Sequence, residues 1–284
     1  MRRKLIASLS LLALALTACG SSENQEASPS DATITPAASV DSQATEKVNT
    51  LFSITPTAQQ AQQVAIAKCV TEKGGNWNIS TVEKQQFDIR QQLSPKPLSV
   101  DQARQHGYNS PTASAENQTS GNDTAAMALY AGNPDNGSVS VDGVPGAIAA
   151  DGCLAQSYKD VFGSAEAGVL FESGILNLPL PYINAVGEDS AYSALLEEWH
   201  TCMKDTYQVD IATPDLASVD TSMDSNTLAV YDATCREKVN FEPRVGDTLD
   251  AYLTTFLTEQ EPVIDQLTTA KETAEKNAPA ILGN

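Results

Sequence analysis

Residues 189–207, with the sequence DSAYSALLEEWHTCMKDTY, contain the clearest secondary-structure signal in the chain. Glu188 and Asp189 lie where negative charge stabilises the first turn of a helix. Apolar side chains then recur at intervals of three and four residues, which places them along one side of an α-helix: Tyr192, Leu195, Leu196, Trp199, Cys202 and Met203. A helix with one apolar side has to pack against other elements, so this stretch predicts a helical core.

Similar patterns on both sides of this stretch predict further helices. Capping boxes, in which a Ser or Thr precedes a Gln by three residues, indicate helix starts at Thr57 and Ser99. Pro262 is expected to interrupt the last helical segment or to begin a new helix. The predicted helices are 57–73, 80–93, 99–106, 125–131, 152–162, 189–207, one around Cys235, and a long C-terminal segment.

Strand patterns are almost absent. A brief alternation at Ser138-Val139-Ser140-Val141 allows at most one small hairpin, and no run of strand–helix–strand units occurs. The sequence therefore predicts a mostly α protein with a single disulfide-braced helical domain.

The first residues resemble a bacterial export signal. Arg2, Arg3 and Lys4 precede a short apolar run that is followed by Leu16-Thr17-Ala18-Cys19. Leu-x-Ala-Cys resembles the lipobox, in which the cysteine thiol receives lipid, palmitate included, and becomes the new N-terminus. We therefore expect residues 1–18 to be a signal peptide and Cys19 to be lipidated, which places the protein on the outer face of the cytoplasmic membrane.

The composition changes after the lipobox. Residues 19–50 contain Ser, Ala, Thr, Asp, Glu, Gln and Pro with almost no large apolar side chains. Such a segment buries too little surface to offset its ordering entropy, so we expect a disordered tether. The predicted helical extracytoplasmic domain is 51–284, and no later segment is apolar enough over 18 residues to span a membrane.

Four cysteines remain in the predicted domain: Cys69, Cys153, Cys202 and Cys235. An even number in an exported chain favours two disulfides over free thiols. A zinc site formed by four thiolates is the alternative, but it normally needs two ligands close together in sequence. Three connectivities remain open. A weak internal echo between Lys68-Cys69-Val70 and Thr201-Cys202-Met203, each followed by a second cysteine-bearing helix, favours Cys69–Cys153 and Cys202–Cys235.

Several short motifs, taken in order, resemble those of a group of uncharacterised actinobacterial lipoproteins. They are Cys69-Val70 with Gly74, Gly107-Tyr108, Leu129-Tyr130-Ala131-Gly132, Gly152-Cys153, Trp199-His200-Thr201-Cys202-Met203 and Asp232-Ala233-Thr234-Cys235. The sequence departs from the pattern at Gly75-Asn76, where an aromatic residue is usual, and at Thr206, where a glycine is usual. The resemblance implies lipidation, four structural cysteines and a helical fold, and it implies no activity.

The charge of the chain excludes one class of partner. The chain has 17 Lys and Arg against 36 Asp and Glu, a net charge of −19, and three of its basic residues lie in the predicted signal peptide. A body this acidic repels nucleic acid and anionic lipid headgroups. We therefore expect no nucleic-acid partner, and contact with the membrane only through the N-terminal lipid.

Residue patterns typical of enzymes are missing from the sequence. It contains no Gly-x-Ser-x-Gly, Ser-x-x-Lys or His-Glu-x-x-His motif, and its only histidines are His106 and His200. We interpret His200 as the edge of a packed helix face and His106 as a helix-terminal residue. The other candidates are interpreted as structural: Glu197 and Glu198 as a solvated face, Asp210, Asp215, Asp220 and Asp224 as surface charge, and Tyr192, Trp199, Tyr252 and Phe256 as core.

These observations predict a non-enzymatic envelope lipoprotein without cofactor or metal. Its role would be binding, or assistance to an envelope protein, a transporter or the cell wall. The alternative is a solute-binding lipoprotein of an ABC importer, but such proteins usually have two α/β lobes, and the sequence lacks their periodicity. A protein with two lobes and parallel sheets would favour the importer hypothesis.

Overall fold

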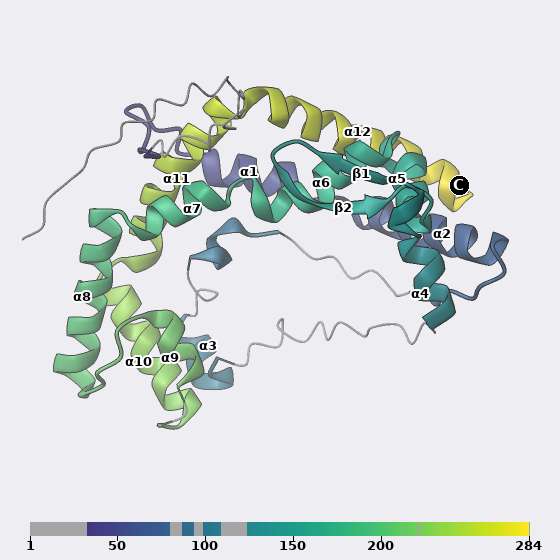
Figure 1. The fold of residues 1–284 in the computed structure, drawn as a ribbon. Helices are drawn as coiled ribbons and strands as arrows, with labels where there is room; N and C mark the ends of the chain where they lie inside the picture. Colours follow the sequence, from purple (N-terminus) through teal and green to yellow (C-terminus); the bar gives the residue numbers. More distant parts are fainter. Residues whose placement is uncertain (1–32, 80–86, 94–98, 109–123, 221, 284) are drawn as a thin grey trace, which may run out of the picture. The chain divides into compact units, whose positions relative to one another are not determined.

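The computed structural model of this chain describes residues 33–79, 87–93, 99–108, 124–220 and 222–283 (Figure 1). Residues from Ile34 onward form one unit, which is helical apart from a single two-stranded hairpin. The prediction of a mostly α, disulfide-braced body with one small hairpin is confirmed. The predicted signal peptide and Cys19 lie outside the described residues.

The described residues form helices of very different lengths. In chain order the α-helices are α1 (Ala44–Phe52), α2 (Pro56–Glu72), α3 (Val100–His106), α4 (Thr124–Ala131), α5 (Cys153–Phe162), α6 (Ala165–Asn177), α7 (Leu180–Gly187), α8 (Ser190–Tyr207), α9 (Pro214–Val219), α10 (Ser225–Lys238), α11 (Phe241–Glu259) and α12 (Glu261–Leu282). Short 3₁₀ turns lie at Ile89–Gln92 and Pro134–Asn136.

The hairpin pairs β1 (Ser138–Val141) with β2 (Val144–Ala149) in antiparallel register. Val139 lies opposite Ile148, and Val141 lies opposite Val144 across the turn. Both strands pack against α6. A two-stranded hairpin is only marginally stable on its own, so its position depends on this helix.

Helices α2, α5, α6 and α12 pack on one another around the first disulfide. Helices α2 and α12 pack against each other, and both have small side chains that recur at three- and four-residue spacing and are almost completely buried: Ala58, Ala61 and Ala65 on α2, and Ala270, Ala274 and Ala278 on α12. Side chains at this spacing share one face of a helix, and alanines there let two helix backbones approach closely.

Helices α3, α8, α9, α10 and α11 form a second group around the other disulfide. Its core contains Trp199, Met203 and Leu253, all fully buried. Alanines again form a close helix contact, here between Ala103 on α3 and Ala229 and Ala233 on α10. Helix α11 also packs against α1 and α7 and so joins the second group to the rest of the unit.

The two disulfides have the connectivity that the internal echo favoured. Cys69 on α2 bonds Cys153 at the start of α5, and Cys202 on α8 bonds Cys235 on α10, with Cα–Cα distances of 5.5 and 5.7 Å. These distances lie in the normal range for disulfides. The four-thiolate zinc alternative is therefore excluded in this structure.

The end of α4 and the start of α5 meet at Gly132 and Gly152, two glycines of the motifs that resemble those of the lipoprotein group. Gly132 has a φ of +75°, and a Cβ on Gly152 would lie 2.5 Å from the backbone oxygen of Ala131. A side chain on Gly152 would therefore collide with backbone. The close approach brings the start of α5, and with it Cys153, beside α4.

The predicted boundary between tether and domain at residue 50 needs correction, because the folded unit begins at Ile34. Ala44 and Val48 on α1 are fully buried, and Thr45 donates its backbone N–H and its hydroxyl to Asp250 on α11 at 2.8 and 2.6 Å. Helix α1 is stabilised by packing against α11. The low apolar content of residues 19–50 therefore led to the wrong prediction that the tether extends to residue 50.

Substitution by alanine is expected to have opposite effects on stability at two glycines that lie inside helices. A Cβ on Gly168 of α6 would lie 2.2 Å from the buried ring of Tyr158, whereas a Cβ on Gly246 of α11 would meet nothing within 4 Å. We expect Gly168→Ala to lower the free energy of unfolding by about 1–3 kcal/mol through overpacking. Gly246→Ala should raise it by about 0.5–1 kcal/mol. Urea denaturation of both variants measures the difference, and a stabilising Gly168→Ala would contradict the packing described.

Candidate functional site

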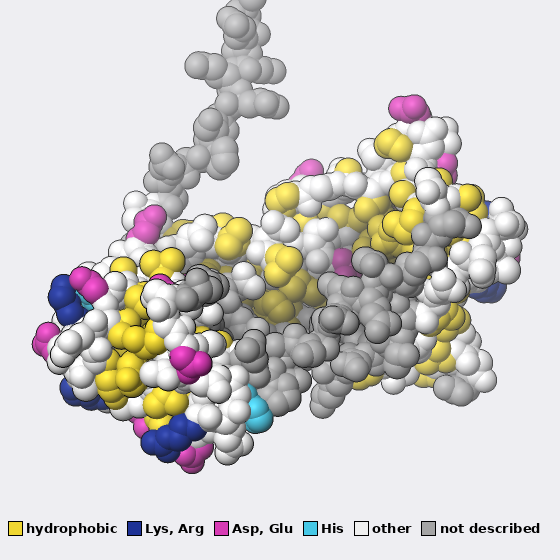
Figure 2. All heavy atoms as spheres, turned by 90° about the horizontal axis from the view of Figure 1, so that it is seen from below, with side chains coloured by type: hydrophobic (Ala, Val, Ile, Leu, Met, Phe, Trp, Pro, Cys, Tyr) yellow, Lys and Arg dark blue, Asp and Glu magenta, His cyan; other side chains and the backbone are white. Residues whose placement is uncertain are grey.

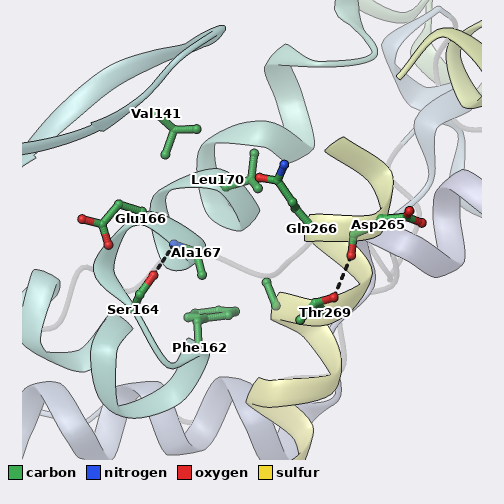
Figure 3. Close-up of a pocket in the computed structure, with 10 residues that line it drawn as sticks. Val141, Phe162, Ser164, Glu166, Ala167, Leu170, Asp265, Gln266 and Thr269 are labelled. Carbon is green, nitrogen blue, oxygen red and sulfur yellow. Dashed lines mark hydrogen bonds between the residues drawn. The ribbon is translucent and has the colours of Figure 1, made fainter. Parts of the chain in front are cut away.

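The candidate site is a groove of about 400 Å³ between the hairpin, α6 and α12 (Figure 3). This volume is near the lower end of the range for ligand sites, so it fits one large side chain or a small molecule. The groove is lined by Val141, Phe162, Ser164, Glu166, Ala167, Leu170, Asp265, Gln266, Thr269 and Ala270.

The apolar lining comes from three places in the chain. Phe162 at the end of α5 and Leu170 on α6 are buried, and Val141 on β1 is half-buried. Figure 3 shows Val141, Leu170 and Phe162 around the groove, with the Gln266 side chain extending from α12 toward Leu170. The groove thus has an apolar lining with a single amide directed into it.

The turn between α5 and α6 is fixed by local sequence. Gly163 ends α5 in the left-handed conformation, with a φ of +85°, and Ser164 caps α6 by accepting a hydrogen bond from the backbone N–H of Ala167 at 3.0 Å. The left-handed position favours glycine, and serine is a preferred N-cap residue. These two residues set Phe162 and Glu166 on either side of a tight corner.

The rim of the groove is acidic. Glu166 and Asp265 are exposed on opposite sides of it, from α6 and α12. The hairpin and α6 contain acidic side chains and no Lys or Arg, and α12 contains four acidic residues against two lysines. One of those lysines, Lys271, is bound to the backbone oxygen of Thr50 on α1. The potential around the groove is therefore negative.

Asp232 on α10 is the centre of a second, buried polar cluster. Its Oδ1 accepts hydrogen bonds from Trp199 Nε1 at 2.9 Å and Arg236 Nε at 2.7 Å, and its Oδ2 accepts one from the Tyr108 hydroxyl at 3.3 Å. Arg236 also donates to Glu242 on α11 at 2.9 Å. Burial raises the pKa of the Asp232 carboxyl, while the Arg236 charge opposes that rise. Because Asp232 and Trp199 are at most 1% exposed, this cluster ties helices together and offers no access to a ligand.

A second carboxyl with a shifted pKa is that of Glu172, which is half-buried on α6. Burial raises the pKa of the Glu172 carboxyl on α6, and a hydrogen bond from the Gln62 side chain opposes the rise. The negative charge of Glu172 in turn contributes to the raised pKa of Tyr130 and Tyr158. Ionised Glu172 is therefore poorly solvated in the folded protein.

We expect Glu172→Gln to stabilise the protein at neutral pH. A raised pKa means that the folded state holds this proton more tightly than the unfolded state, whose value is near 4.5. The stability that Glu172 contributes is then present below that value and is lost as the pH rises through the folded pKa. Melting temperatures between pH 4 and 8 should fall less steeply for Glu172→Gln than for the unsubstituted protein. A matched Glu237→Gln variant, exposed on α10, should follow the unsubstituted protein.

The two histidines lie apart from the groove. His200 is half-buried on α8, and its Nε2 lies 2.8 Å from Asp210 Oδ1; Lys204 donates to the same carboxylate at 3.2 Å. These contacts lower the pKa of the Asp210 carboxyl, the one from His200 most. His106 is the exposed last residue of α3. The structure does not bring the two rings into one described site.

The remaining sequence candidates have structural roles. Glu198 binds Arg244 of α11, and Glu197 is exposed. Of the acidic loop, Asp224 caps α10, Asp215 lies in the first turn of α9, and Asp220 accepts from Ser222. No group of three His, Cys, Asp or Glu among the described residues is arranged to hold a metal ion. The aromatic residues Tyr192, Trp199, Tyr252 and Phe256 are all buried in the core, as predicted.

Exposed apolar side chains also occur away from the groove. Leu176, Leu180 and Leu216 are 56%, 39% and 53% exposed. Figure 2 shows hydrophobic side chains gathered in several patches on one face, with acidic and basic groups between them. Exposed apolar side chains interspersed with charged groups are common on protein surfaces and mark no site by themselves.

The groove residues were not predicted from the sequence. The alternating run at 138–141 indicated the hairpin, but it gave no indication that Val141 would face α6 and α12. Helices α6 and α7 were not predicted, although Ser164 and Glu166 resemble a helix start. The groove joins segments more than 120 residues apart, and one sequence contains no signal for that proximity.

No protein-family model matches this chain, and no curated protein or solved structure is significantly similar to it. The resemblance to actinobacterial lipoproteins therefore stays a prediction. Of the described helices, none is both long enough and apolar enough to cross a bilayer.

Proposed function

We propose that this chain is a lipid-anchored protein of the bacterial cell envelope whose helical body binds an envelope partner without catalysing a reaction. The observation that carries the proposal is the groove between the hairpin, α6 and α12, which combines an apolar lining with an acidic rim. A transporter subunit, another envelope protein or the cell wall would supply the partner.

The sequence Leu16-Thr17-Ala18-Cys19 supports the anchor, since this motif resembles the lipobox. Several acyl chains on Cys19 would hold the protein stably at the membrane, whereas one chain would bind only marginally. The folded unit begins at Ile34, so the 14 residues between Cys19 and the body span at most roughly 50 Å when fully extended. Such a short connection would keep the body near the outer face of the cytoplasmic membrane.

The described side chains support binding rather than catalysis. All four cysteines of the body are in disulfides, and His200 and Asp210 form a pair outside the groove. The groove itself is lined by apolar groups, two rim carboxylates, one amide and two hydroxyl-bearing side chains. Glu166 and Asp265 lie on opposite sides of the groove with their carboxylates pointing outward, where they would meet a partner that extends beyond the groove (Figure 3).

The second candidate function is solute capture for an ABC importer. The groove volume supports it, because about 400 Å³ is enough for a small molecule. Its weakness is architectural: importer-binding proteins usually enclose their ligand between two α/β lobes, and the described residues contain one hairpin and no parallel sheet. We therefore favour a macromolecular partner.

Site-specific photo-crosslinking on intact cells tests the proposal. A photoreactive amino acid at Gln266, which is exposed and extends into the groove, should give adducts with a defined protein or with wall material. The matched control is the same amino acid at Glu272, which is also exposed on α12 but does not line the groove. Adducts that are equal at both positions, or absent from both, would contradict binding through the groove. Loss of membrane association in Cys19→Ala cells tests the anchor separately.

A further inference from the structure

We infer that the groove receives a basic protein segment that inserts one large apolar side chain between Val141, Phe162 and Leu170. Lys or Arg residues on either side of that anchor would then lie next to Glu166 and Asp265. This inference rests on the proposed function and specifies the chemistry of the partner.

The apolar anchor follows from the size and lining of the groove. About 400 Å³ is too small for a whole helix but sufficient for one or two large side chains. Phe162 and Leu170 are only 3% and 4% exposed, so the floor is already packed and rigid. An apolar side chain held against them would be removed from water at little conformational cost to the groove.

The basic flanks follow from the charges of the three elements. Glu166 and Asp265 are on opposite sides of the groove, so a chain lying across it would pass both carboxylates. The hairpin adds Asp142 at its turn, and the first turn of α12 adds Glu261. No Lys or Arg occurs in the hairpin, in α6 or in residues 261–270 of α12 to neutralise them. A cationic segment would therefore be attracted electrostatically before it docks.

The same charges disfavour other occupants. Residues 19–33 contain Glu23, Glu26 and Asp31 without any Lys or Arg, so the chain's own N-terminal segment would be repelled. A second copy brings another strongly negative body, since the whole chain has a net charge of −19. Anionic membrane headgroups are disfavoured for the same reason. A basic segment of a different protein is the occupant that complements both the rim and the lining.

Selection from a displayed library of random dodecapeptides against the immobilised full-length chain tests this inference. We expect enriched peptides to contain one Leu, Ile, Phe or Trp flanked by Lys or Arg. The affinity of an enriched peptide should fall at least fivefold when its apolar anchor becomes Ser, and it should weaken as salt rises. Enrichment of acidic or uncharged peptides would overturn the inference and would favour a neutral ligand, including a small molecule.

Charge-neutralising variants locate the binding. The double variant Glu166→Gln/Asp265→Asn should weaken an enriched peptide at least fivefold. The matched double variant Asp205→Asn/Glu237→Gln removes two exposed carboxylates from α8 and α10 and should change its affinity less than twofold. If the two double variants weakened peptide binding equally, the inferred site would be wrong, because the peptide would then be attracted only by the net charge of the protein.

The two proposals fail in different ways. If Gln266 crosslinks to a protein in cells but the crosslinked segment is acidic, the groove binds a partner and only the inferred chemistry is wrong. If Gln266 and Glu272 give the same adducts, the proposed function itself fails. Mass spectrometry of the crosslinked peptide distinguishes these outcomes.

Discussion

Replacing Asp232 with alanine is expected to lower the free energy of unfolding by about 3–5 kcal/mol, because removing one partner of a buried ion pair leaves the other poorly compensated. Asp232 is the carboxylate nearest the Arg236 guanidinium, whose side chain is only 4% exposed. The substitution also removes the acceptor of the Trp199 N–H, which is fully buried. Glu242 remains bound to Arg236, but it is itself partly exposed and contacts the other end of the guanidinium.

Guanidinium chloride denaturation of Asp232→Ala, Arg236→Ala and the double variant measures this effect. If the pair acts as a unit, the double variant should lose clearly less stability than the sum of the two single losses. Asp205→Ala is the control, since its exposed carboxylate on α8 should contribute less than about 0.5 kcal/mol. A loss below 1 kcal/mol for Asp232→Ala would show that the cluster is not what joins α3, α8 and α10.

The parts of the fold that could be predicted are those that depend on local sequence. Helix α8 occurs almost exactly where the apolar stripe of residues 189–207 indicated, with Asp189 as its N-cap. Ser99 and Gln102 form the predicted capping box, and a new helix begins next to Pro262. In each case the residues that set the helix boundary lie within one helical turn of it.

Predictions failed where a competing local signal or a distant contact decided the structure. The N-cap of α2 is Thr55 rather than Thr57, because Pro56 favours the first position of a helix. Helix α1 was missed because its stability comes from α11, about 200 residues away. The acidic loop at 209–225 contains the short helix α9, which starts at a Thr213-Pro214 pair of the same kind.

The candidate site was even less predictable than the fold. The residues with reactive side chains, such as His200 and the cysteines, stand out in the sequence, and each of them has a structural contact in the folded protein. The groove instead consists of ordinary apolar and acidic residues whose significance comes only from their proximity. Phe162 and Asp265 are unremarkable in sequence and become a site only when α5 and α12 pack together.

Removing the Cys69–Cys153 disulfide is expected to destabilise the protein by as much as about 4–5 kcal/mol. The bond closes a loop with a sequence separation of 84, and the chain-entropy model attributes this stabilisation to the restricted unfolded state. Alanine is the appropriate replacement at both positions, because Cys153 is fully buried and Cys69 nearly so. For a domain of this size the loss corresponds to a decrease of roughly 10–15 °C in melting temperature.

The Cys202–Cys235 pair provides the matched comparison. Its sequence separation is 33, for which the same model gives about 4 kcal/mol, so Cys202→Ala/Cys235→Ala should lose slightly less stability than Cys69→Ala/Cys153→Ala. Thermal unfolding of both double variants, with and without reductant, measures the two losses, and the variants should respond to reductant only through the bond that each retains. Losses below about 1 kcal/mol for both pairs would mean that packing alone stabilises these helices. The groove depends on that result, since Cys153 begins α5, the helix that ends at Phe162 in the floor of the groove.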